Sequence, residues 1–128
     1  MHLLLDTHVL LWTLLEPARL RSEVIALIAS PSNQVSASAA SLWEIAIKQS
    51  LGKLELPGHA EVWLPMACQR VGIALMPISP ADALAVRKLP WHHRDPFDRL
   101  LVAQVSAGLT LVTHDEALRP YGVATVWT

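Results

Sequence analysis

Residues 2–6 of the chain read HLLLD, and this stretch indicates the fold. Three consecutive leucines without polar alternation are typical of a strand that is buried on both faces, as strands are in a parallel sheet. Similar short apolar runs predict four more strands, at 34–38, 73–77, 110–113 and 124–127. The sequence therefore predicts a central parallel sheet of about five strands.

Helical signals alternate with these strands. Capping residues predict four helices, which begin near Ser22, Ser41, Ser79 and Asp95 and end at residues 29, 51, 88 and 108. Pro65 should interrupt a helix over 59–71, so two short helices are expected there, with Pro65 at the start of the second. Strands separated by helices predict a three-layer α/β/α sandwich, and the length of 128 residues predicts a single domain, 1–128.

The composition suggests a protein partner. Hydrophobic residues make up 52% of the chain and five of them are tryptophans, more apolar surface than one small core is expected to absorb. A homodimer or a bound peptide would cover the remainder.

The charge balance and the single cysteine bear on the kind of ligand the protein binds and on the cellular compartment in which it works. Ten Lys and Arg against eleven Asp and Glu give a net charge of −1, which argues against a general nucleic-acid binder but leaves room for a local basic cluster. Cys68 alone cannot form an internal disulfide and is expected to be a small buried hydrophobe. Because Asp6 and His8 interrupt the apolar N-terminus, neither a signal peptide nor a membrane span fits, and we expect a cytoplasmic protein.

Four acidic residues are placed at the carboxyl edge of the predicted sheet. Asp6 ends the first strand and Asp115 follows the fourth, while Glu44 and Asp98 lie near the starts of helices that should face the same edge. Ligands of open α/β sheets bind at this edge, near the point where the strand order reverses.

Each acid also has a structural explanation. Glu44 has capping-box spacing from Ser41, Asp98 would interact favourably with a helix N-terminus, and Asp115 could cap the segment that follows it. Asp6 is the least ordinary, because an unpaired carboxylate at the end of a buried strand costs several kcal/mol.

If the four carboxylates converge, a cation is needed among them. Unit charges about 4 Å apart repel by roughly 4 kcal/mol at an effective dielectric constant near 20. Oxygen ligands favour Mg²⁺, with Mn²⁺ as a substitute, and no Cys or His spacing predicts a tight zinc site. The six histidines are expected to be mostly structural or solvated.

The order of these acids resembles that of VapC-type PIN domains over the whole chain. The runs that carry the resemblance are DTHVLLW, SLWEIAIK, LGKLELP, HRDPFDRLLVAQ and LVTHDEAL. The resemblance implies strand order 3-2-1-4-5, with Asp6 and Asp115 flanking the switch point. It also implies a Mg²⁺-dependent endoribonuclease, usually a homodimer, that is the toxin of a toxin–antitoxin module and is inhibited by a VapB-like antitoxin.

The resemblance implies a role for each acid. Asp6 and Asp98 would be direct metal ligands, and Glu44 and Asp115 would complete the cluster directly or through water. Asp95 is placed outside these four because a capping role already explains it. Secondary candidates are Thr7 and Thr113, which would hydrogen-bond the carboxylates or the attacking water unless they serve only as strand formers.

Contacts to RNA phosphates are expected from Arg94, Arg99, Lys48 and Lys53, although surface helices commonly carry such residues. Trp91, beside His92 and His93, would stack on a base or else pack in a core or interface. The alternative to an enzyme is a non-catalytic PIN-like module that binds RNA or a protein partner. A degenerate site of that kind should have lost some of the four acids.

Overall fold

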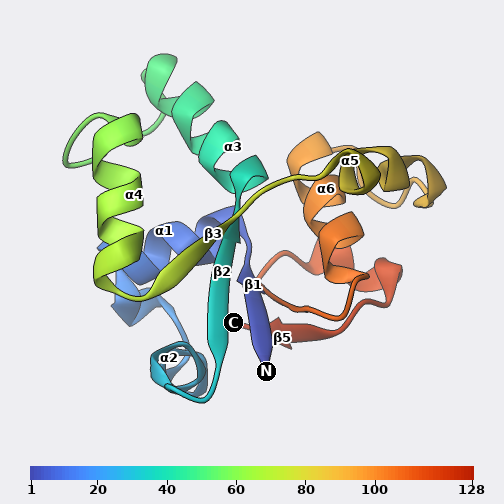
Figure 1. Cartoon of the computed structure of the whole chain (residues 1–128), viewed down its shortest axis with the longest axis horizontal. Coiled ribbons are helices and arrows are strands. Elements are labelled where there is room, and N and C mark those ends of the chain that lie inside the picture. Colours follow the sequence, from blue (N-terminus) through green and yellow to red (C-terminus); the bar gives the residue numbers. More distant parts are fainter.

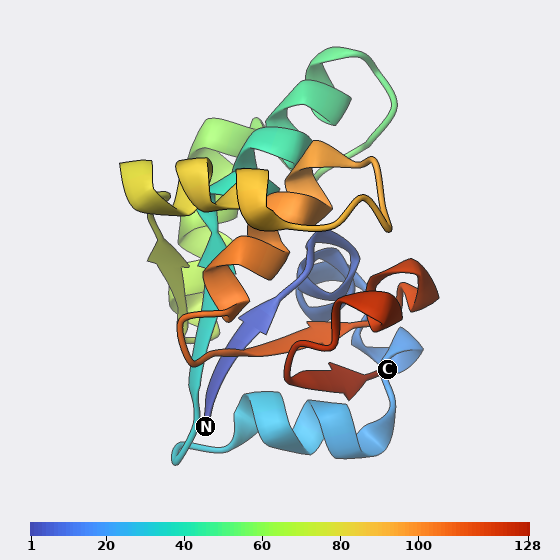
Figure 2. The same cartoon turned by 90° about the vertical axis from the view of Figure 1, so that its right-hand side faces the viewer.

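A computed structural model describes all of residues 1–128 and contains one five-stranded sheet. Its order is β3-β2-β1-β4-β5, and every neighbouring pair is parallel. The strands are β1 (His2–Leu5), β2 (Gln34–Ser38), β3 (Ile73–Met76), β4 (Thr110–Thr113) and β5 (Thr125–Trp127). The predicted order is confirmed, and Figure 2 shows β1, β4 and β5 side by side.

Helices cover both faces of the sheet (Figure 1). The α-helices are α1 (Thr7–Leu15), α2 (Ser22–Ala29), α3 (Ala39–Ser50), α4 (Ala60–Arg70), α5 (Pro80–Ala85) and α6 (Pro96–Val105), and the 3₁₀ segments are η1 (Pro17–Arg19), η2 (Val86–Lys88) and η3 (Glu116–Tyr121). Leu3 and Leu5 belong to a core with residues of α1 to α4. Leu4, which points to the opposite face, belongs to a second core with α6 and η3. The three-layer architecture is confirmed.

Helix α1 was not predicted from the sequence. Its residues, THVLLWTLL, are apolar on nearly all sides, so they show no period of 3.6 that would distinguish a helix from a buried strand. The helix begins because Asp6 is its N-cap, with the carboxylate accepting a hydrogen bond from the backbone N–H of Val9 at 2.8 Å.

The predicted break at Pro65 and two of the predicted helix starts are wrong, and the helices predicted to end at residues 88 and 108 are α-helical only to Ala85 and Val105. Pro65 lies inside a continuous helix α4, whose residues Ala60, Leu64 and Cys68 are buried at four-residue spacing. This packing offsets the one backbone hydrogen bond that proline cannot donate. Helix α3 begins two residues before Ser41 and is capped by Ser38, and Ser22 is the first residue of α2 and makes no capping hydrogen bond.

The fold places the switch point of the sheet between β1 and β4. The chain leaves β1 toward β2 on one side, and β4 lies on the other, so the carboxyl ends of β1 and β4 border a crevice. None of the helices has the length and apolar character needed to cross a membrane.

Candidate active site

Asp6 lies at the centre of the crevice, directly after β1. It is 3% exposed, and both carboxylate oxygens are occupied. One accepts from Val9 N–H, and the other accepts a hydrogen bond from the hydroxyl of Thr113 at the end of β4. Burial raises the pKa of Asp6 above its ordinary value, against the opposing effect of these two hydrogen bonds.

Glu44 reaches the same crevice from helix α3. The hydroxyl of Thr7 donates to Glu44 Oε1 at 2.7 Å and lies 3.0 Å from Ser41 Oγ. Lys48, one turn further along α3, donates to Glu44 Oε2 at 2.7 Å. Ser41 therefore supports Thr7, and no capping box with Glu44 is formed.

Helix α6 brings Asp98 to the crevice. Asp95 is its N-cap and accepts from the backbone N–H groups of Phe97 (2.8 Å) and Asp98 (3.1 Å), as its sequence position predicts. The buried Gln104 fixes the helix at its other end, because its Oε1 accepts from the Ser38 hydroxyl at 2.6 Å. This bond links the start of α3 to α6, the two helices that carry Glu44 and Asp98.

Asp115 approaches from the loop after β4. Its backbone N–H donates to Thr113 Oγ1 at 3.0 Å, and its carboxylate accepts from Ala117 N–H at 3.0 Å as the N-cap of η3. Thr113 therefore contacts both Asp6 and Asp115 and holds the two strand ends together.

The structure brings the four predicted acids, with Asp95, into one cavity. The cavity has a volume of about 190 Å³ and is lined only by polar side chains. Lys48 is its only lysine, and arginine is absent from its lining. Burial raises the pKa of Asp98 to about 6, and the charges of Asp95 and Asp6 act in the same direction against the His93 hydrogen bond. Lys48 is therefore the one permanent positive charge in the cavity against five carboxylates, and the donor set fits a divalent cation.

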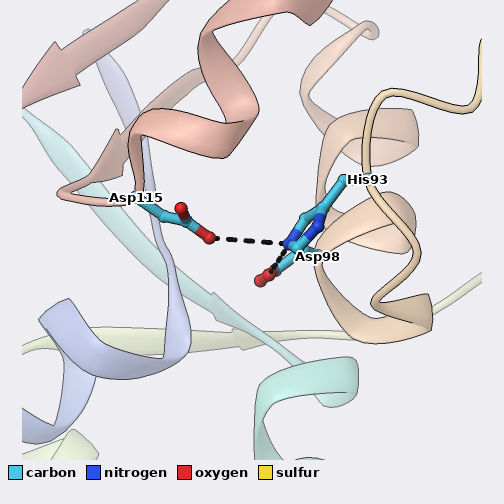
Figure 3. Close-up of side chains that lie close together, drawn as sticks. All are labelled: His93, Asp98 and Asp115. Carbon is cyan, nitrogen blue, oxygen red and sulfur yellow. Dashed lines mark hydrogen bonds and ion pairs between the residues drawn. The ribbon is translucent and has the colours of Figure 1, made fainter.

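Two histidines, His8 and His93, line the pocket although the sequence does not single them out, and the carboxylates contact His93. Its Nε2 lies 2.8 Å from Asp98 Oδ2 and 3.5 Å from Asp115 Oδ2 (Figure 3). Its neighbour His92 packs edge-on against Tyr121 instead, with ring centroids 5.1 Å apart. Nothing in the sequence distinguishes the two histidines, because the loop that carries them has no repeating pattern.

Arg99 was expected to contact RNA, and this expectation is wrong. The side chain is 2% exposed, and its guanidinium donates to the carbonyls of Val86, Leu89 and Pro90 and to the hydroxyl of Tyr121 at 2.9–3.4 Å. The ring of Trp91 covers it at 3.7 Å. These acceptors satisfy the buried charge without a carboxylate, so Arg99 holds the 86–93 segment in place.

The other basic candidates lie at the surface around the pocket. Lys53 and Arg94 are exposed, and Lys48 is paired with Glu44. A second cavity, of about 310 Å³, shares Lys48 and His8 with the acidic pocket and is also lined by Lys53, Arg19 and Trp12. Cationic and aromatic side chains thus border the carboxylates on one side, together with Glu16 and Glu55.

The fold and pocket define an α/β protein with a polyacidic site at the switch point of its sheet. Residues 3–123 match the model of the PIN domain family. The chain therefore belongs to the PIN-domain family, whose members are generally nucleases that use divalent metal ions. No curated protein matched the sequence.

Solved structures with this fold include toxin–antitoxin complexes. The chain is similar to VapBC2 from Rickettsia felis, bound to a promoter DNA fragment, with a TM-score of 0.73, 14% identity and 98% of both chains covered. It is similar to DNA-bound VapBC from Salmonella typhimurium, with a TM-score of 0.70, 17% identity and coverage of 98% and 97%. For FitAcB from Neisseria gonorrhoeae the TM-score is 0.64, with 18% identity and coverage of 98% and 96%.

Proposed function

We propose that this chain is a Mg²⁺-dependent endoribonuclease and the toxin of a VapBC-type toxin–antitoxin module, acting in the cytoplasm. The observation that carries the proposal is the convergence of Asp6, Glu44, Asp98 and Asp115 in one polar cavity. If each acid had only a separate structural role, the four would have no reason to lie together in a cavity with so little positive charge. The intact set also favours an enzyme over a non-catalytic binding module.

Asp6 and Asp98 would hold the metal ion directly, and Glu44 and Asp115 would hold it directly or through water; Mn²⁺ should substitute for Mg²⁺. When bound, the ion would lower the pKa of a water molecule and offset negative charge on the phosphodiester. Thr7 and Thr113 keep Glu44 and Asp6 in fixed orientations through the hydrogen bonds described above. Attack of water on phosphorus breaks the bond to the 3′ oxygen, which takes up a proton, so the products carry 5′-phosphate and 3′-hydroxyl ends.

RNA is supported as the substrate by the cavity beside the acids. Lys48, Lys53 and Arg19 line it together with Glu16 and Glu55. Lys48 pairs with Glu44 and Arg19 with Glu16, so Lys53 is the cation that is open to a phosphate. Trp12, which lies in the same cavity, offers an aromatic surface of the kind on which single-stranded bases stack. Arg94 remains a further candidate for a phosphate contact.

A protein partner is supported by apolar surface away from the acids. A groove of about 270 Å³ between α3 and α4 is lined mainly by apolar residues, among them Trp43 and Leu64. Trp43 is 60% exposed and Trp91 is 76% exposed, and exposed aromatic residues are enriched in interfaces. A VapB-like antitoxin and a second copy of the chain are the proposed partners that would cover the groove and the exposed tryptophans, and the mass of the purified protein in solution tests the homodimer.

The decisive experiment is cleavage of total cellular RNA by purified protein with Mg²⁺, with Mn²⁺ and with EDTA. We expect discrete cuts with 5′-phosphate ends that disappear in EDTA and in the Asp98→Asn variant. This variant is the matched control for contaminating nucleases, because it is purified in the same way. If folded, antitoxin-free protein neither cuts RNA nor binds a metal ion, the proposal fails and the binding module becomes the better explanation.

A further inference from the structure

We propose that His93 is a nitrogen ligand of the metal ion, which makes the site a mixed nitrogen and oxygen site. This inference rests on the proposed function, because it assigns a ligand to the same pocket. His93 Nε2 and one carboxylate oxygen each from Asp98 and Asp115 lie within 4.8 Å of one another. In Figure 3, dashed lines join one imidazole nitrogen of His93 to a carboxylate oxygen of each aspartate.

The spacing of these atoms is that of ligands around one ion. Bonds of about 2.1 Å to a divalent metal place neighbouring ligand atoms roughly 3 Å apart in an octahedral site. His93 Nε2 is 2.8 Å from Asp98 Oδ2 and 3.5 Å from Asp115 Oδ2. An ion that replaces the shared proton between His93 and Asp98 would therefore require only small movements of both side chains.

Hydrogen bonds to Tyr121 and Arg99 fix the backbone segment that carries the His93 imidazole. The backbone N–H of His93 donates to the hydroxyl of Tyr121 at 3.1 Å, and the same hydroxyl accepts from Arg99 at 3.1 Å. Arg99 also binds three carbonyls of the segment that leads to His93. Arg99 and Tyr121 thus hold the backbone at His93 in the position from which its side chain enters the pocket, whereas the ring of His92 packs against that of Tyr121.

A nitrogen ligand changes which ion the pocket prefers. Imidazole suits transition metals, whereas Mg²⁺ prefers oxygen and keeps much of its water. The preference of this pocket for Mn²⁺ over Mg²⁺ should therefore be stronger than that of a site made only of four carboxylates. Replacement of His93 by glutamine, which retains a polar side chain, should weaken Mn²⁺ binding at least about tenfold and change Mg²⁺ binding much less.

The test is pulsed electron paramagnetic resonance of Mn²⁺ bound to the purified full chain, which detects a directly bonded nitrogen without any catalytic turnover. The variants are His93→Gln and the matched control His92→Gln, with calorimetric titration of Mn²⁺ and Mg²⁺ for all three proteins. Circular dichroism establishes that each variant is folded. We expect nitrogen modulation in the unmodified protein and in His92→Gln, and its loss in His93→Gln.

The outcomes separate this inference from the proposed function. Mn²⁺ that binds without nitrogen modulation, or modulation that survives in His93→Gln, overturns the ligand assignment and leaves the metal nuclease intact. His93 would then only orient Asp98 through a hydrogen bond. A folded protein that binds neither Mn²⁺ nor Mg²⁺ overturns both.

Discussion

The two sides of the acidic pocket differ in how the protein holds their carboxylates. On the inner side, Asp6 and Glu44 are buried, and every carboxylate oxygen has a donor from Thr113, Val9, Thr7 or Lys48. On the outer side, the Asp98 and Asp115 side chains are 19% and 37% exposed, and His93 is the ionisable donor near both. The inner side is fixed before any ligand binds, whereas the outer side can respond to pH and to a metal ion.

Asp6→Asn tests the inner side and should have the largest effect. Asparagine is also a good N-cap, so helix α1 should be retained while the charge is lost. We expect RNA cleavage to fall on the order of 10³-fold, about 4 kcal/mol in the activation free energy, with little loss of thermal stability. Single-turnover cleavage and thermal unfolding measure the two quantities. Activity within tenfold of the unmodified protein would exclude Asp6 as an essential ligand.

Arg99→Met tests how the outer side is supported. The substitution removes four hydrogen bonds from a fully buried group, so the free energy of unfolding should fall by roughly 3 to 4 kcal/mol. The matched control is Arg94→Met, at an exposed position five residues earlier, which should stay within about 0.5 kcal/mol. Urea denaturation compares them, and equal stabilities would contradict the structural role of Arg99.

The pH dependence of the free energy of unfolding tests whether the Asp98 carboxylate on the outer side is destabilised by burial and by its acidic neighbours. Because burial raises the pKa of Asp98 to about 6, the folded protein binds this proton more tightly than the unfolded chain does. In EDTA, the free energy of unfolding should therefore fall by up to about 3 kcal/mol as the pH rises from about 4 to above 6. Asp98→Asn should reduce this slope and be more stable than the unmodified protein at neutral pH. Urea denaturation across this pH range measures the effect, and identical slopes would contradict it.

Lys53→Gln should have the smallest effect, because it changes one exposed charge beside the pocket. RNA affinity should fall about two- to fivefold, and the slope of log affinity against log salt should decrease by about 1. Fluorescence anisotropy in the inactive Asp98→Asn background measures binding without cleavage. Lys88→Gln is the control, because Lys88 lies in η2 and lines neither the acidic pocket nor the cavity beside it. Equal losses from both variants would argue for non-specific attraction.

The strands and the four acids could be predicted from the sequence because their signals are local. A strand buried on both faces is a continuous apolar run, as residues 2–6 show, and each predicted strand boundary lies within one residue of the observed one. The acids could be placed because parallel strands and the helix starts between them share one edge of the sheet. Helix α1 was missed for the complementary reason, since a helix that is apolar all round has no local periodicity to reveal it.

The sequence by itself determined the parallel sheet, the alternation of strands and helices and the edge at which the acids gather. Only the tertiary structure decided which similar residues enter the site. Arg94 and Arg99 are alike in sequence, yet one is exposed and the other buried; His92 and His93 are adjacent, yet only His93 faces the carboxylates. The direction of a side chain in a loop is set by partners distant in sequence, such as Tyr121, and no local pattern of residues encodes those partners.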